Sequence, residues 1–184
     1  MQPELAAFLA PRVQRLGYLG ESFQCTAHQP AAPLKFLEFT EERKHALPGH
    51  LRESIALTIA MLMDNAYARV QHERLCKQLG FSSERLNGVL SLDASDNSQV
   101  LTHTEHSVRQ LAISVVKHGG RNTSREFQAV IEAIGVQQAI AVMNLISRYM
   151  SHAVTVNAPD LPPPALAVAS GRSSKELIRQ AEVE

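Results

Sequence analysis

Glu53 and His72 are the two residues of this 184-residue chain whose types and spacing predict chemistry. Within "NAYARVQHERLCKQLG" the residues that share a helical face with His72, at spacings of three and four, are Asn65, Ala68, Cys76 and Leu79. The imidazole is therefore the only strong proton donor or acceptor on a face of small or apolar groups and one amide. If the chain folds back at Asp64, the Glu53 carboxylate meets this imidazole in a pocket of low dielectric constant, which is an arrangement suited to general acid–base catalysis.

Each of these residues also has a structural interpretation. The predicted helix of residues 51–63 follows Pro48-Gly49, which would place Glu53 in its first turn, where a negative charge interacts favourably with the helix dipole. His72 can be a core histidine with its hydrogen bonds satisfied. Tyr67 can pack with its hydroxyl bonded as well as it can contact a substrate. The residues alone leave these alternatives open.

The spacing of apolar residues predicts an all-α fold, because spacings of three and four recur and strict alternation is almost absent. The expected helices cover residues 3–16, about 33–44, 51–63, 65–80, 83–90, 104–120, 124–135 and 136–158. The segment 51–63 is apolar almost all round, so we expect it at the centre of the fold. Gly80 is expected to end its helix in a left-handed conformation.

Two helix starts carry the capping-box pattern, in which a hydroxyl residue is followed three positions later by a glutamate. One is Thr102 with Glu105, and the other is Thr123 with Glu126. Both are expected to cap the helices that follow them.

The segment "PDLPPP" is expected to end the compact part of the chain, because consecutive prolines cannot continue a helix. We therefore predict a single domain over residues 1–160. Residues 161–184 would form a proline segment and a tail, in which Ser173 and Glu176 form another capping pattern and predict a short docking helix.

Composition narrows the function classes. The 18 basic and 18 acidic side chains cancel, so no net field attracts nucleic acid or an anionic membrane, and neither is expected as a partner. Cys25 and Cys76 form no CxxC pair and are expected to be reduced thiols. Neither a signal peptide nor a membrane-spanning stretch is predicted. We expect a soluble, cytoplasmic protein.

Other polar residues have structural explanations. His103 and His106 lie one turn apart but lack a convincing third ligand, so no metal site is predicted. Arg148, Tyr149 and His152 lie close together on the predicted last helix. A surface or oligomer contact is the interpretation we give these three, although Arg148 could meet an anionic substrate at an interface.

Four segments, in this order, carry a family resemblance: "HQPAAPLKFLEF", "LPGHLRESIAL", "YARVQHERLCKQLGFS" and "RYMSHAVTVNA". From about residue 20 to 160 the chain resembles the carboxymuconolactone decarboxylase family, which includes the alkylhydroperoxidase-D-like proteins. The resemblance implies an alkylhydroperoxidase-D-like helical fold. It also implies assembly into homotrimers or hexamers with the active site near a subunit interface.

In the peroxidase branch of this family, a glutamate, a CxxC pair and a histidine form a proton relay and redox centre. The resemblance places that glutamate on Glu53 and that histidine on His72, but the cysteine positions fall on Asn65 and Ala68. An amide and a methyl group cannot cycle between thiolate and disulfide, so thiol peroxidase activity is not supported. Cys76 has no resolving partner nearby in the sequence.

In the decarboxylase branch the corresponding region reads approximately YEWxxH. Tyr67 and His72 match it, whereas Ala68 replaces the acidic residue and Arg69 the tryptophan. The resemblance implies a cofactor-free decarboxylase or related lyase that acts on a small organic acid or lactone. Glu53 and His72 would handle protons, and the residues predicted to bind substrate are Tyr67, Asn65 and Ala68.

A second hypothesis belongs to a different class of protein. Asn65, Ala68 and Arg69 occupy positions where the family carries reactive groups, so the chain could retain the oligomeric scaffold and only bind a ligand or a partner. Redox cycling through Cys25 and Cys76 is a third hypothesis with less support from the residues.

Overall fold

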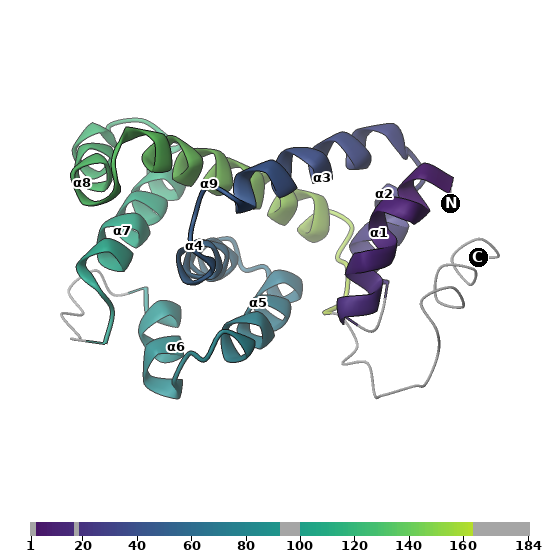
Figure 1. Cartoon of the computed structure of the whole chain (residues 1–184), viewed down its shortest axis with the longest axis horizontal. Helices are drawn as coiled ribbons and strands as arrows, with labels where there is room; N and C mark the ends of the chain where they lie inside the picture. The colour runs from purple at the N-terminus through teal and green to yellow at the C-terminus, as the bar shows by residue number, and fades with distance from the viewer. Residues whose placement is uncertain (1–2, 17–18, 93–99, 164–184) are drawn as a thin grey trace. The chain divides into compact units, whose positions relative to one another are not determined.

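The structure, a computed structural model, describes residues 3–16, 19–92 and 100–163, and every regular element within them is a helix (Figure 1). The helices are α1 (Pro3–Leu16), α2 (Glu21–Thr26), α3 (Ala31–Lys44), α4 (Gly49–Leu62), α5 (Ala66–Gln78), α6 (Ser83–Leu90), α7 (His103–His118), α8 (Ser124–Ile134) and α9 (Val136–Asn157). The predicted all-α class is confirmed for these residues. None of the helices combines the length and hydrophobicity that a membrane span requires.

The chain divides into two compact units, and among the described residues the boundary lies between Phe39 and Thr40. In the first unit, α1, α2 and the beginning of α3 share a small core of Leu5, Leu9, Val13, Leu19 and Leu37. The helix α2 was not predicted, because six residues are too few for a periodic pattern. The single domain over 1–160 stays a prediction, and the expected docking helix of the tail lies outside the described residues.

In the second unit, which runs from Thr40 to Pro163, α4 is the central helix. It contacts α5, α6, α7 and α9, and Figure 1 shows it nearly end-on among them. Every residue from Glu53 to Ala60 is buried, as the apolar composition of this segment predicted. The main core forms where α4 meets α7, α8 and α9, around Ile55, Ile59 and Leu111.

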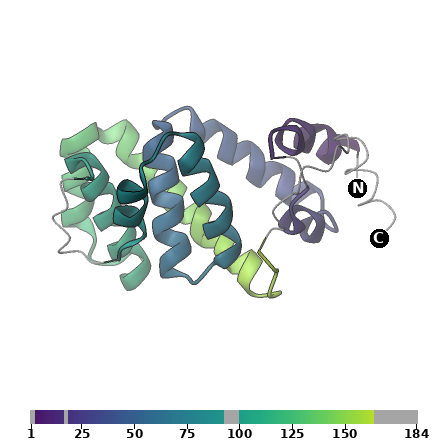
Figure 2. The same ribbon diagram turned by 90° about the horizontal axis from the view of Figure 1, so that it is seen from below.

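A short turn joins α4 to α5, and the two helices lie side by side (Figure 2). Asp64 turns the chain with a positive φ of 50°, a conformation that aspartate tolerates better than most residues. Asn65 then caps α5: its backbone N–H donates to Ala60 at 2.8 Å, and its side-chain oxygen accepts from the Ala68 N–H at 2.9 Å. The turn therefore fixes the direction in which α5 leaves α4.

The two predicted capping boxes have different outcomes. At α7 the Thr102 hydroxyl accepts from the Glu105 N–H, and the Glu105 carboxylate accepts from the Thr102 N–H, so this box is confirmed. At α8 the predicted box of Thr123 with Glu126 is wrong. Thr123 has a ψ of 9°, far from the extended value usual for a cap, and its hydroxyl is directed toward the Gly120 carbonyl instead.

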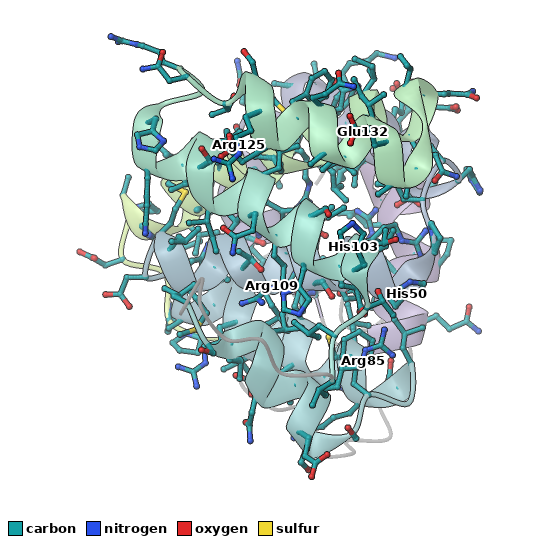
Figure 3. All side chains as sticks on the ribbon, turned by 90° about the vertical axis from the view of Figure 1, so that its left-hand side faces the viewer. His50, Arg85, His103, Arg109, Arg125 and Glu132 are labelled. Atoms are coloured by element: carbon teal, nitrogen blue, oxygen red, sulfur yellow. The ribbon has the colours of Figure 1, made fainter. Side chains whose placement is uncertain are left out.

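Two arginines connect α6 to α7 (Figure 3). Arg85 of α6 forms an ion pair of 2.5 Å with Glu105, whose side chain is fully buried. Arg109 of α7 donates to the Val89 carbonyl at 3.3 Å and to the Ser91 carbonyl, beyond the end of α6. These bonds hold α6 and α7 together.

We predict that Thr102→Ala lowers the free energy of unfolding by about 1 kcal/mol, because one cap of α7 is lost. Thr123→Ala removes the same atoms from the start of α8, where no side-chain cap exists, and is expected to cost less than half as much. Urea unfolding of the two variants measures the difference. Equal losses would contradict the capping assignment.

Candidate functional site

Glu53 lies in the second turn of α4. Because Pro48 is the N-cap and Gly49 the first helical residue, no acidic side chain occupies the first turn. The placement of Glu53 in the first turn, predicted from the sequence, is therefore wrong, and an interaction with the helix end does not explain its presence. Only 9% of the residue is exposed, so the carboxylate requires a partner inside the protein.

The partner is His72. Its Nδ1 lies 2.6 Å from Glu53 Oε2, and the two side chains are 9% and 12% exposed. An ionised carboxylate only accepts hydrogen bonds, so with Glu53 ionised Nδ1 carries the proton and donates it. The other ring nitrogen, Nε2, is then the atom available for proton transfer. The structure thus brings together the two residues that the sequence predicted to be catalytic.

Tyr149 of α9 also packs against His72. The two rings meet edge to face, with centroids 5.1 Å apart, and only 8% of Tyr149 is exposed. The expected surface or oligomer contact is therefore wrong for Tyr149, because its ring is buried within its own chain. Arg148 lies over the Tyr149 ring at 4.5 Å and donates from Nε to the Thr40 hydroxyl at 3.2 Å.

His152 is a second imidazole on this side of α9, one turn beyond Tyr149. Its ring meets Tyr67 of α5 edge to face, with centroids 6.3 Å apart. Burial lowers the pKa of His152 to about 3, and the positive charge of Arg148 and the proximity of His72 act in the same direction. His152 is consequently neutral at physiological pH. The sequence predicted a surface or oligomer contact for His152, and its spacing from Tyr149 already placed the two on one helix face.

The three residues predicted to bind substrate have different environments. Tyr67 is buried and contributes to the wall of an open hollow of about 400 Å³. The hollow is lined by Asp64, Ala66, Tyr67, Val156, Asn157, Asp160, Leu161, Pro162 and Pro163. Asn65 and Ala68 are absent from this lining, and their hydrogen bond to each other caps α5. Their local role is structural, and substrate contact stays a prediction for both.

Cys76 follows His72 on α5 and is fully buried in a cluster with Leu57, Phe81 and Val89. Burial, together with the nearby charge of Glu53, raises the pKa of the Cys76 thiol to about 12. The group is therefore a protonated thiol at neutral pH, which is a poor nucleophile. Cys76 lies on the helical face that was predicted to include His72, and it is a core residue. Leu79, at the end of the same face, is half-exposed.

The remaining histidines form no metal centre in the part of the chain that the structure describes. No three His, Cys, Asp or Glu side chains there come close enough together to hold a metal ion. His103, at the start of α7, is exposed.

Comparison of the chain with models of protein families, with curated proteins and with solved structures found no match in any of the three.

The two cysteines are predicted to differ in reactivity. Cys25 is exposed and should react with a thiol reagent such as 5,5′-dithiobis(2-nitrobenzoate) in the folded protein, whereas Cys76 should react only after unfolding, because its thiol is buried and protonated. Thiol release measured with and without denaturant tests this. Rapid reaction of Cys76 in native Cys25→Ser protein would contradict it.

His152 is predicted to make stability depend on pH. Its folded pKa of about 3 lies below the usual value of 6.5, so between these values the unfolded chain binds a proton that the folded chain does not. Stability contributed by the neutral ring is thus present above about pH 6.5 and lost as the pH falls toward 3. His152→Phe should reduce this slope in urea unfolding measured between about pH 7 and 5. His118→Phe, at an exposed histidine, is the matched control.

Proposed function

We propose that this chain is a carboxymuconolactone decarboxylase-like protein, a cofactor-free decarboxylase or related lyase that acts on a small organic acid or lactone. Glu53 and His72 are its proton-handling residues. The observation that carries the proposal is the 2.6 Å contact between the two side chains, buried between consecutive helices. The order of the family-like segments supports it.

The proposed chemistry follows from the geometry of this pair. A carboxylate at Nδ1 fixes the orientation and the tautomer of the imidazole, so Nε2 is the nitrogen that delivers a proton and recovers it. In a decarboxylation the bond to the carboxylate breaks, CO₂ leaves and the electron pair passes into a neighbouring carbonyl. Protonation of the resulting enolate at carbon by His72 completes the reaction, and solvent returns the proton to His72.

The environment of Cys76 and the identities of Asn65 and Ala68 argue against the peroxidase activity of the wider family. The resemblance implies that Asn65 and Ala68 fall at the positions of the redox cysteines, and Cys76 is a buried thiol with a pKa of about 12. A thiol peroxidase requires an accessible thiolate and a resolving partner. The proposal therefore includes neither redox cycling through Cys25 and Cys76 nor a disulfide between them.

We also propose that the chain forms a homotrimer or hexamer with an alkylhydroperoxidase-D-like fold, as the resemblance implies. Light scattering during size-exclusion chromatography gives the mass of the assembly. The expected localisation is the cytoplasm, and no nucleic acid or membrane partner is proposed.

A second candidate function is ligand binding without catalysis. The observation that favours it is the hydrogen bond between Asn65 and the Ala68 N–H, since two positions that carry reactive groups in the family serve here to cap a helix. A ligand that binds at the Glu53–His72 pair and is recovered chemically unchanged after long incubation would support this candidate over a lyase.

His72→Gln is predicted to lower kcat/KM for a decarboxylated acid by about 100-fold or more, because an amide cannot deliver the proton. Substrates are sought by following CO₂ release from a panel of small β-keto acids and lactone carboxylic acids. Glu53→Gln should also lower the rate, since it removes the carboxylate that holds the imidazole in place.

The matched control is His103→Gln, which changes an exposed histidine at the start of α7 and should retain full turnover. Circular dichroism and the mass of the assembly show whether each variant keeps its fold. Unchanged turnover in a correctly folded His72→Gln protein would reject the assignment.

A further inference from the structure

Beyond the Glu53–His72 pair, a second imidazole belongs to the same group of side chains. On α5, Tyr67 and His72 both face α9, and on α9 Tyr149 and His152 both face α5. Tyr67 contacts His152 and His72 contacts Tyr149, each edge to face. The two contacts therefore follow one another along the seam between the helices. Tyr149 and His152 are three residues apart, which is about 4.5 Å along a helix axis.

These ring contacts account for the way α5 and α9 approach each other. The two helices are not among the pairs whose backbones lie closely together, whereas each of them packs closely on α4. Long side chains therefore span the distance between their backbones, and both imidazoles lie in that layer. His72 is close enough to contribute to the lowered pKa of His152, so the two imidazoles are neighbours in this layer.

We propose that His152 is a second catalytic imidazole of the Glu53–His72 site, positioned to donate a hydrogen bond to a carbonyl or enolate oxygen of the bound ligand. This inference rests on the proposed function and adds to it a residue that the family resemblance does not assign.

His72 and His152 have different partners, so we assign them different roles in the reaction. The Nδ1 of His72 is bonded to the Glu53 carboxylate, which fixes the ring and leaves Nε2 as the nitrogen that can deliver a proton. His152 faces the phenol ring of Tyr67 and has the guanidinium of Arg148 nearby, which favours a neutral ring. A neutral imidazole has one N–H donor, which can stabilise negative charge on oxygen without losing its proton.

The proposed step balances without any added reagent. The bond between the carboxylate and the α-carbon breaks, CO₂ leaves, and the electron pair moves into the carbonyl to give an enolate. The His152 N–H holds the enolate oxygen, and the proton of His72 Nε2 goes to the α-carbon. The product is a ketone or a lactone, and His72 regains its proton from solvent.

Binding of tetronate tests the inference. This five-membered lactone is an enolate at neutral pH, so it mimics the proposed intermediate without reacting. His152→Phe keeps a ring against Tyr67 but removes the N–H donor, and it should raise the Kd about tenfold or more in calorimetry. His152→Asn keeps an N–H donor but loses the ring, and its Kd should stay within about threefold of wild type.

A packing role for His152 would produce the opposite order, with binding kept in His152→Phe and lost in His152→Asn, and this order would overturn the inference. His118→Phe, at an exposed histidine, controls for the loss of a histidine. In the unaltered chain, the ¹⁵N resonance of the protonated His152 nitrogen should shift as tetronate binds. Absence of that shift in a complex that forms would also overturn it, whatever the variants' stability.

The outcomes separate this inference from the proposed function. Tetronate binding that is weakened by His72→Gln but not by His152→Phe would remove His152 from the mechanism and leave the Glu53–His72 proposal standing. Failure of the folded wild-type protein to bind tetronate at millimolar concentration would count against both.

Discussion

The burial of Glu53 is the constraint on which the site depends. A carboxylate in the interior loses most of its hydration and is tolerated only when hydrogen bonds or positive charge replace it. His72 provides that replacement at 2.6 Å, from the helix that follows in the chain. The pair therefore requires α5 to pack against α4 in one register, because a shift by one residue would rotate the imidazole away from the carboxylate.

The turn between α4 and α5 sets that register. The Asn65 side chain closes the first turn of α5, and its backbone N–H closes the last turn of α4, so one residue ends one helix and begins the next. Asn65 thus contributes to the site by fixing the direction of α5, whatever it does toward a ligand. The Arg85–Glu105 ion pair joins α6 to α7, and both of these helices contact α4.

Much of the fold could be predicted from local patterns, and the errors have physical causes. The helix register placed His72 toward α4, and the apolar composition of residues 51–63 placed α4 at the centre. Glu53 was misplaced by one turn, because Gly49 is a poor helix former and yet begins the helix after Pro48. The capping box predicted at Thr123 does not form, because the conformation of a residue before a helix depends on the preceding turn, here residues 120–122.

Tyr149 and His152 show what a sequence pattern leaves open. Their spacing defines one face of α9, but whether that face meets solvent, another subunit or α5 depends on how distant helices pack. In the folded chain the same face meets α5, and His152, interpreted as part of a surface or oligomer contact, is a neutral imidazole near the Glu53–His72 pair. Their surroundings then distinguish two chemically identical rings. The Nδ1 of His72 is bonded to a carboxylate, while burial and a guanidinium neighbour favour the neutral form of His152. A site with one ring of each kind can supply a proton and a fixed hydrogen bond at the same pH, which a single histidine cannot do.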